Sequence, residues 1–289
     1  MKADFRDQDR IAYGVEDVTR AVDAVRERTA IQPQLALILG SGLGSFVEGL
    51  ENRVALDPGE IPGYPDSTVE GHSGTLVLGK TAGVPIVIQS GRLHVYEGYS
   101  ASTVTFPLRV MRGLGAKVLV VTNVAGGVND EFEAGDLVFV EDHINFQFRS
   151  PLRGSGPIVD EDRFVDLAEP YSRRLLKIAR ATAGESGLVG HVGTYFAVSG
   201  PSYETPAEVQ MIRKLGGDMV GMSTVPEVIA ARHANMDVLG VTCISNRATG
   251  LSPDVLSHDE VIRVAATMEK SLKDLLTRLL PRIADGVPA

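Results

Sequence analysis

Cysteine and tryptophan are nearly absent from this chain of 289 residues, which contains one cysteine and no tryptophan. A single thiol excludes an internal disulfide framework and every metal site built from several cysteines. Cys243 lies in the apolar run VLGVTCIS, a setting typical of a small buried hydrophobic side chain. The six histidines show no HExxH or other metal-ligand spacing. We therefore expect neither a disulfide scaffold nor a metal site.

Basic residues and long apolar runs are also scarce. The chain has 28 basic and 37 acidic residues, and its formal charge is −9. An acidic surface disfavours general binding to nucleic acid or to an anionic membrane. No apolar run approaches the roughly 18 to 20 residues of a membrane span, and the opening MKADFRDQDR lacks the apolar core of a signal peptide. We expect a cytoplasmic protein whose partners are small molecules, with no nucleic acid and no membrane among them.

Short apolar runs alternate with helical patterns along the chain. The runs are typical of strands buried on both faces of a sheet, and they lie at residues 34–39, 75–79, 84–89, 117–122, 136–140 and 236–245. Apolar residues recur with helical spacing over about 10–30, 206–216 and 258–280. This alternation predicts a three-layer α/β fold. Because no linker or repeat interrupts it, we expect residues 1–289 to form a single domain.

A glycine-rich turn, GSGLGS at residues 40–45, follows the first apolar run. Such a turn lets backbone N–H groups approach an anion closely. A dinucleotide-binding loop is one alternative, but the GxGxxG spacing fails at Ser45. Glu60, at the distance expected of a ribose-binding carboxylate, lies in the turn EIPGYP and does not end a strand. Phosphate binding and a purely structural turn both stay open for this segment.

Reactive side chains crowd the segment GRLHVYEGY, which follows the apolar run VPIVIQ. Ligands of open α/β sheets bind at this end of the strands. Arg92 offers a planar fork for phosphate oxygens, and His94 adds a hydrogen-bonding group of adjustable charge. His72, in the upstream motif GHSG, supplies a second imidazole. The alternative interpretation is a polar loop that is simply solvated. In both interpretations we expect Arg92 in a solvated site outside the core.

Three further apolar runs end in small or polar residues. KVLVVT leads into 123–127, which leaves room for a flat ligand, VGM leads into Ser223, and VLGVTCIS leads into Asn246. Tyr203 and Glu204 precede the helical pattern PAEVQMIRKLG, where a ring can stack and a carboxylate can accept from ring N–H groups. With the two segments above, five strand ends carry such residues. Chance accounts for one or two, whereas a shared pocket accounts for all five.

Eight motifs, in order over about residues 30–275, resemble the trimeric class of purine nucleoside phosphorylases. They are GSGLGS, GHSG, GRLHVYEGY, TNVAGG, DHIN, SGPSYETPAE, VGMSTVPE and SNRATGLSPDVLSHDEV. The resemblance implies a central mixed, partly barrel-like β-sheet flanked by helices. It implies phosphorolysis of purine ribonucleosides and 2′-deoxyribonucleosides in purine salvage, with a preference for the 6-oxopurine nucleosides inosine and guanosine. The products would be the free base and (deoxy)ribose 1-phosphate, phosphate would be a co-substrate with no other cofactor, and the assembly would be a homotrimer.

The same resemblance implies a role for each matching residue. The phosphate site would comprise Ser41, His72, Arg92, His94, the backbone N–H of Val124, and Ser223. The ribose site would comprise Tyr96, Met222, His258 and Phe164, the last contributed by a neighbouring subunit. The base site would comprise Ala125, Gly126, Tyr203, Glu204, Val220 and Asn246. Catalysis would involve His94, Glu97, Glu204 and Asn246, and no metal. Glu97 would orient His94, and Asn246 would donate a hydrogen bond to N7 of the departing purine.

The chain departs from the family pattern at three positions: Val124, Tyr203 and Arg247. Val124 would act through its backbone and Tyr203 through its ring, so only Arg247, beside Asn246, is expected to alter base preference. A methylthioadenosine phosphorylase is the nearest alternative, but that relative carries aspartate and threonine where this chain has Asn246 and Ser223. A xanthosine-accepting phosphorylase stays open. A nucleoside sensor without catalysis is disfavoured because the whole phosphate set is present.

Overall fold

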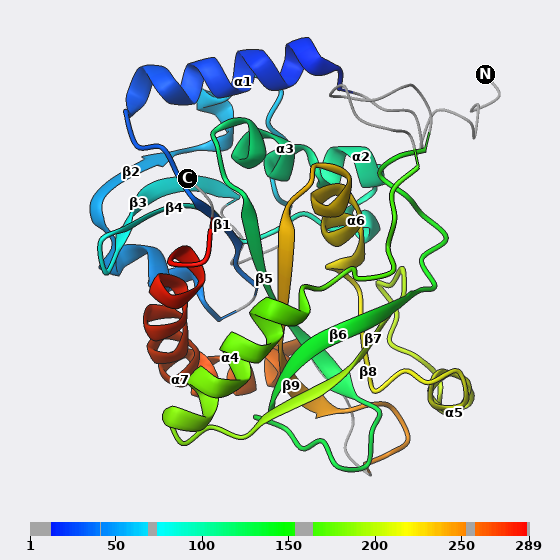
Figure 1. The fold of residues 1–289 in the computed structure, drawn as a ribbon. Helices are drawn as coiled ribbons and strands as arrows, with labels where there is room; N and C mark the ends of the chain where they lie inside the picture. The colour runs from blue at the N-terminus through cyan, green and yellow to red at the C-terminus, as the bar shows by residue number, and fades with distance from the viewer. Residues whose placement is uncertain (1–12, 41, 69–73, 154–163, 253–257, 288–289) are drawn as a thin grey trace, which may run out of the picture.

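The computed structural model describes residues 13–40, 42–68, 74–153, 164–252 and 258–287, and for 258–262 and 265 it describes only the backbone. Nine strands in these ranges form one mixed sheet in the order β2-β3-β4-β1-β5-β8-β7-β6-β9 (Figure 1). In chain order they are β1 (Leu35–Ile38), β2 (Glu51–Leu56), β3 (Thr75–Thr81), β4 (Val84–Ser90), β5 (Val118–Gly127), β6 (Leu137–Asn145), β7 (Gly190–Ala197), β8 (Met219–Gly221) and β9 (Asp237–Arg247).

The sheet closes on itself over part of its width. β5 pairs in parallel with β9, and β9 pairs in antiparallel fashion with β6. β5 also pairs with β8, and β7 joins β8 to β6, so these strands form a closed ring. The expected mixed, partly barrel-like sheet is confirmed. Closure places the end of β9 beside the end of β5.

Helices cover both faces of the sheet (Figure 1). One face is covered by α1 (Val15–Arg28), α2 (Ala101–Val104), α3 (Phe106–Gly113) and α6 (Val225–His233). The other is covered by α4 (Arg173–Glu185) and α7 (His258–Ala284). The expected three-layer α/β domain is confirmed. No helix in the described ranges is long and apolar enough to cross a membrane.

Alternation along the buried strands explains the two cores. On β1, Ala36 and Ile38 belong to the core beneath α3 and α6, and Leu35 and Leu37 belong to the core beneath α7. Cys243, on β9, is buried in the second core, and burial raises the pKa of its thiol to about 12. The expected small buried side chain at this position is confirmed.

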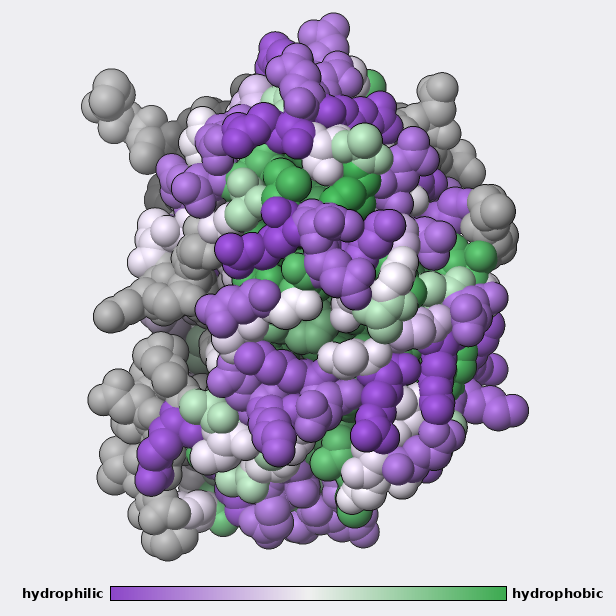
Figure 2. All heavy atoms as spheres, turned by 90° about the vertical axis from the view of Figure 1, so that its left-hand side faces the viewer, coloured by the Kyte–Doolittle hydropathy of each residue, from purple (hydrophilic) through white to green (hydrophobic). Residues whose placement is uncertain are grey.

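Strand β2 shows where the apolar pattern fails. Its sequence, ENRVAL, buries only the final leucine, because β2 is the outer strand of the sheet and pairs on one side with β3. The face of the molecule toward this outer edge is largely hydrophilic, with small apolar areas between polar side chains (Figure 2). A strand with so few buried positions carries no apolar run.

The parallel strands end at one edge of the sheet. β1 is parallel to β4 and to β5, and β5 is parallel to β9, so their carboxyl ends lie together. At the end of β1, the amide of Gly40 donates to Thr122 Oγ1 at 2.9 Å. A Cβ at position 40 would lie 2.8 Å from the carbonyl oxygen of Thr122. The close approach of these two strands therefore explains the glycine at position 40.

Candidate active site

Arg92 lies two residues beyond the end of β4 and is almost fully buried, with 2% of its surface exposed. Its Nη1 donates to Ser223 Oγ at 3.0 Å, and its Nε lies 3.3 Å from Glu227 Oε1 on α6. The interpretation of a simply solvated loop is wrong for Arg92. A guanidinium is stable in the interior only when a buried anion or strong acceptors compensate it, and Glu227 is that anion.

Hydrogen bonds to neighbouring strands hold the turn that carries Ser223. The amide of Ser223 donates to Tyr195 Oη at 3.3 Å, from β7. Thr224 has a φ of +73°, and its Oγ1 accepts from Asn123 Nδ2 on β5 at 2.9 Å. A positive φ is costly for a branched residue and persists only where surrounding contacts determine it. The Ser223 hydroxyl is therefore fixed toward Arg92 by contacts from β5 and β7.

Glu97 fixes the loop that carries His94. Its Oε1 accepts the His94 backbone N–H at 2.6 Å and lies 3.2 Å from His94 Nδ1. Its Oε2 accepts the Thr68 amide at 2.8 Å and the Thr68 hydroxyl at 2.6 Å. Burial alone would raise the pKa of Glu97, but the hydrogen bonds from His94 and Thr68 outweigh burial and lower this pKa to about 2. Glu97 is thus a permanently ionised anchor.

His94 is a neutral imidazole at pH 7. Burial lowers its pKa below the ordinary 6.5, and the nearby Arg92 lowers it further, although Glu97 acts in the opposite direction. With Nδ1–H facing Glu97, the lone pair of Nε2 is the acceptor that this ring presents. Tyr96 stacks on the imidazole with ring centroids 4.5 Å apart and planes 14° apart. Burial, then Glu97, raises the pKa of Tyr96 to about 12, so its phenol also stays neutral.

A β-bulge sets the direction of Asn246. On β5, Ala125 pairs with Ile244 and Gly126 pairs with Asn246, so Ser245 is the extra residue. Ser245 Oγ donates to Asn246 Oδ1 at 2.6 Å, and Asn246 Nδ2 donates to the carbonyl of Arg247 at 2.9 Å. The second bond uses one of two amide hydrogens. A Cβ at Gly126 would lie 3.4 Å from Asn246 Nδ2, so the glycine gives the amide room.

Glu204 and Tyr203 stand immediately before α5 (Pro206–Lys214), whose N-cap is Thr205. Burial, with the nearby Glu208 as a smaller cause, raises the pKa of Glu204, and burial raises the pKa of Tyr203. The preceding segment packs on Met222, since a Cβ at Gly200 would lie 2.3 Å from its sulfur.

The base-site residue Val220 also reaches this region. It is buried and pairs with Gly126 across β5 and β8. Ala125, Gly126, Val220 and Asn246 therefore lie together at the end of β5, whereas Tyr203 and Glu204 lie in the segment before α5.

Some of the predicted site residues are not placed by this structure. Ser41 and His72 lie outside the described residues, and α7 begins at His258, whose side chain also lies outside them. Phe164 is 88% exposed and borders a separate hollow of about 430 Å³ with Leu152 and Ile229. Within one chain, therefore, Phe164 does not line this hollow with any of the other candidates that the structure describes.

Sequence reasoning missed the side chains that support the site. Glu227 and Thr68 hold Arg92 and Glu97, and Thr224 holds the Ser223 turn. One signal was available, because Glu227 is the sole charged residue in the apolar stretch VPEVIAA. A carboxylate on an otherwise apolar helix indicates a buried ion pair.

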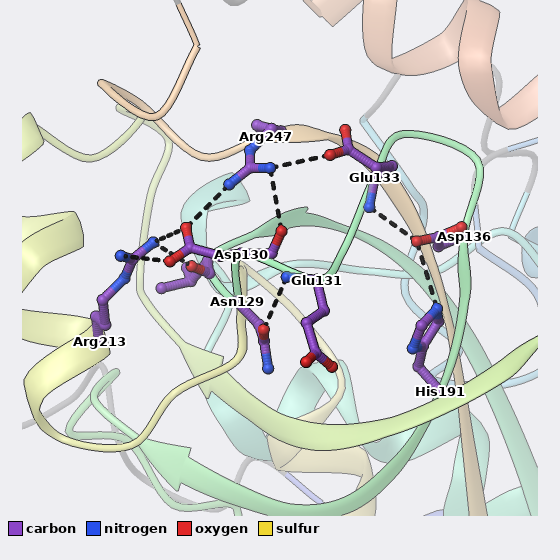
Figure 3. A network of polar contacts seen from close by, with 9 residues as sticks. Asn129, Asp130, Glu131, Glu133, Asp136, His191, Arg213 and Arg247 are labelled. Carbon is purple, nitrogen blue, oxygen red and sulfur yellow. Dashed lines mark hydrogen bonds and ion pairs between the residues drawn. The ribbon is translucent and has the colours of Figure 1, made fainter.

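Arg247 turns away from the Asn246 side chain. Its guanidinium bonds to Glu133 Oε1 at 3.0 Å and to Asp130 Oδ1 at 3.1 Å (Figure 3). Two histidines outside the candidate site have protein contacts as well: His143 Nδ1 lies 3.3 Å from Tyr171 Oη, and His191 Nε2 lies 3.5 Å from Asp136 Oδ2. Across the described ranges, three or more His, Cys, Asp or Glu side chains nowhere gather as a metal site would need.

Comparison with known proteins identifies the family. Residues 34–281 match the Phosphorylase superfamily. The sequence is 50% identical over 259 residues to purine nucleoside phosphorylase 1 of Geobacillus stearothermophilus, covering 90% of this chain and 93% of that protein. The chain belongs to the purine nucleoside phosphorylases. Bovine purine nucleoside phosphorylase (Bos taurus) is 41% identical over 278 residues, which cover 94% of this chain and 96% of the bovine protein.

The fold agrees with that membership. A crystal structure of a Schistosoma purine nucleoside phosphorylase with hypoxanthine superposes with a TM-score of 0.89 at 35% identity, covering 96% of this chain and 99% of that one. Purine nucleoside phosphorylases are pentosyltransferases, and the prediction that this chain is such an enzyme is confirmed. The sensor without catalysis is not the favoured interpretation.

Acid should weaken the Glu97 anchor selectively. A folded-state pKa of about 2, below the ordinary 4.5, means that the stability contributed by ionised Glu97 is complete above about pH 5. It is lost as the pH falls toward 2. The wild type should therefore unfold with a higher free energy than Glu97→Gln at pH 7, and this gap should narrow by about 1 kcal/mol at pH 4. Urea unfolding followed by circular dichroism measures the free energy of unfolding of both proteins at both pH values. If the difference between them stays constant or widens at pH 4, Glu97 does not have the lowered pKa.

Proposed function

We propose that this chain catalyses phosphorolysis of purine ribonucleosides and 2′-deoxyribonucleosides, with a preference for inosine and guanosine. The products are the free base and (deoxy)ribose 1-phosphate, inorganic phosphate is the co-substrate, and no metal or organic cofactor takes part. One observation carries the proposal: a buried arginine, Arg92, is fixed to Ser223 beside a neutral His94, at the sheet edge that also holds the Asn246 amide. One structure of the Schistosoma mansoni enzyme contains inosine and another contains adenosine, and a Schistosoma enzyme structure contains guanosine.

On the phosphate side, directed donors and the Nε2 acceptor of neutral His94 hold the nucleophile. The proposed ligands are Ser41, His72, Arg92, His94, the Val124 N–H and Ser223. Because Arg92 and Ser223 are already fixed to one another, little side-chain entropy is lost when phosphate binds. The anion then faces the anomeric carbon, where positive charge develops as the glycosidic bond stretches. Phosphate thus both attacks and stabilises the sugar cation.

On the ribose side, ring side chains and a thioether form the proposed walls. The residues are Tyr96, Met222, His258 and, from a neighbouring subunit, Phe164. Tyr96 stays an uncharged phenol because burial raises its pKa to about 12. A phenol without charge leaves phosphate as the partner of the developing sugar cation.

On the base side, Asn246 and Glu204 read the purine edge, with Ala125, Gly126, Tyr203 and Val220 around the ring. Negative charge develops on the departing base, and a hydrogen bond from the Asn246 amide to N7 strengthens with it. Such a bond stabilises the transition state more than the ground state. The Ser245 hydroxyl bonded to Oδ1 supports this orientation, since it leaves the NH₂ group as the end that faces outward.

The whole chain, residues 1–289, forms one nucleoside phosphorylase domain in this proposal, and the protein acts in the cytoplasm as a homotrimer. The exposed Phe164 supports the assembly. A large aromatic side chain that is 88% exposed among the described residues is typical of an interface residue.

Phosphate dependence is the first test. Inosine should be consumed only when phosphate is present, and ribose 1-phosphate should form; release of free ribose without phosphate indicates a hydrolase instead. Arg92→Ala strands the buried Glu227, so Arg92→Lys is the cleaner variant because it keeps the charge and loses the fork. The KM for phosphate should rise about tenfold or more with the fold intact. An unchanged phosphate KM rules out Arg92 as a ligand.

Base selectivity tests Asn246 and Glu204. A 6-oxopurine offers N1–H to a carboxylate and N7 or O6 to the amide, whereas adenosine reverses the 6-position edge and leaves buried groups without partners. Such a mismatch reduces kcat/KM by up to about 10⁴-fold. Asn246→Asp should relax the preference, because a carboxyl group accepts from N6 and donates to N7 when protonated. Steady-state assays with inosine and adenosine measure this preference. Equal kcat/KM values for the two nucleosides in the wild type, or an unchanged ratio of these values in Asn246→Asp, refute the role of Asn246 in base selection.

Assembly provides the test for Phe164. Phe164→Ala removes no core packing from its own subunit, but it removes an aromatic wall from the proposed neighbouring ribose site. The KM for inosine should rise roughly tenfold while the KM for phosphate stays constant. Sedimentation at assay concentration should show a trimer. A fully active monomer disproves the shared site.

A further inference from the structure

The direction of the Asn246 amide depends on the main chain of Arg247. Asn246 Nδ2 donates to the Arg247 carbonyl at 2.9 Å, so a shift of that carbonyl turns the amide. Arg247 is the last residue of β9, and the amide of Ala248 after it still donates to the Gly127 carbonyl on β5 at 2.8 Å. The Arg247 side chain adds contacts with the loop that follows β5 to this backbone attachment.

One carboxylate, Asp130, joins Arg247 to helix α5. Arg247 Nη2 donates to Asp130 Oδ1 at 3.1 Å, and Arg247 Nη1 reaches the Asp130 carbonyl at 3.3 Å. From the opposite side, the fork of Arg213 donates to Asp130 Oδ2 at 3.1 Å and to Oδ1 at 2.7 Å. Figure 3 shows Asp130 between the two guanidinium groups. Two-point pairing of this kind fixes orientation as well as distance.

Helix α5 connects Arg213, which binds Asp130, to Glu204. The helix begins directly after Glu204, with Thr205 as its N-cap, and Arg213 lies in its last turn. α5 stands at the periphery of the molecule (Figure 1), and its only buried residues are Val209 and Ile212. A helix with so little buried surface depends on its polar attachments for its position. Arg213 supplies them, since it also donates to the carbonyl of Val128 at 2.8 Å.

From these contacts we propose that Asp130 is a positioning residue that sets the spacing between Asn246 and Glu204, and thereby the discrimination between 6-oxopurines and 6-aminopurines. This inference rests on the proposed function, because it assigns no new reaction. Asp130 touches no substrate. It ties the strand that ends in the amide to the helix that follows the carboxylate.

The environment of Asp130 makes its role separable from folding. Its side chain is 70% exposed, so its ion pairs contribute little to global stability and are screened by salt. A small displacement of a hydrogen-bonding group nevertheless matters for selectivity, because discrimination depends on bond geometry.

The neighbouring Glu131 provides a matched control. Its amide bonds to Asn129 Oδ1 at 3.0 Å, but its carboxylate points away from both arginines in Figure 3. Asp130→Ala and Glu131→Ala therefore remove the same charge from the same loop, and only the first removes the link between Arg213 and Arg247.

The experiment measures kcat/KM for inosine and for adenosine at saturating phosphate, the KM for phosphate, and thermal unfolding, for the full-length wild type and both variants. Asp130→Ala should lower the inosine-to-adenosine ratio of kcat/KM by about three- to tenfold, with an unchanged KM for phosphate. Glu131→Ala should match the wild type. Asp130→Asn keeps an acceptor oxygen without the charge, so its inosine-to-adenosine ratio should lie between those of the wild type and Asp130→Ala. At about 1 M salt, where the Debye length is about 3 Å, the wild-type ratio should approach that of Asp130→Ala.

Two results overturn the inference: equal ratios for Asp130→Ala and Glu131→Ala, or a ratio in Asp130→Ala that is unchanged while unfolding occurs at lower temperature. Both are read against wild-type turnover of inosine with phosphate, which is measured first. Failure of that turnover rejects the proposed function itself, whereas failure of the variant comparison alone rejects only the role of Asp130.

Discussion

The buried pair between Arg92 and Glu227 is the interaction on which the candidate site depends. Both side chains are 2% exposed, with Nε and Oε1 3.3 Å apart. Neither charge is tolerable in this place alone, so each fixes the other, and α6 is thereby joined to the end of β4. Ser223, two residues before the start of α6, accepts a hydrogen bond from Arg92 Nη1 and so fixes the second side of the guanidinium. A phosphate-binding arginine held in this way is presented in one orientation before any ligand arrives.

Sheet closure gives the base side its geometry. If β5 and β9 ran as neighbours without an irregularity, Asn246 would pair one residue further along β5. The extra residue, Ser245, shifts the register, bends the strand and supplies the hydroxyl that orients the Asn246 oxygen. The bulge therefore sets the direction of the Asn246 side chain and, through Ser245, the rotation of its amide group. Gly126 opposite leaves the space that this arrangement requires.

The sequence predicted six largely buried strands, β1, β3, β4, β5, β6 and β9, because burial on both faces produces continuous apolar runs. It did not predict β2, which is an outer strand with one buried residue. The strand ends were recognisable as one site because parallel strands bring their carboxyl ends together. The burial of Arg92 was not recognisable, since it depends on Glu227, 135 residues away in the chain and brought close only by the fold. Likewise the position of Arg247 beside Asn246 suggested an effect on base preference, but it did not reveal that Asp130 and Glu133 bind the guanidinium. Long-range pairing of charges leaves no local pattern.

Charge balance around Arg92 indicates how a phosphate dianion is recognised in an acidic protein. Glu227 offsets the arginine, Glu97 is ionised with a pKa of about 2, and burial keeps His94 neutral. Among these described groups the net charge is negative, so long-range attraction does not bring phosphate to the site. Recognition then depends on hydrogen-bonding groups with fixed directions, which is why the supporting contacts to Ser223 and His94 matter as much as the charge. A neutral His94 with its Nδ1 proton facing Glu97 offers Nε2 as an acceptor. The form of phosphate that this acceptor suits is the one that still carries a proton.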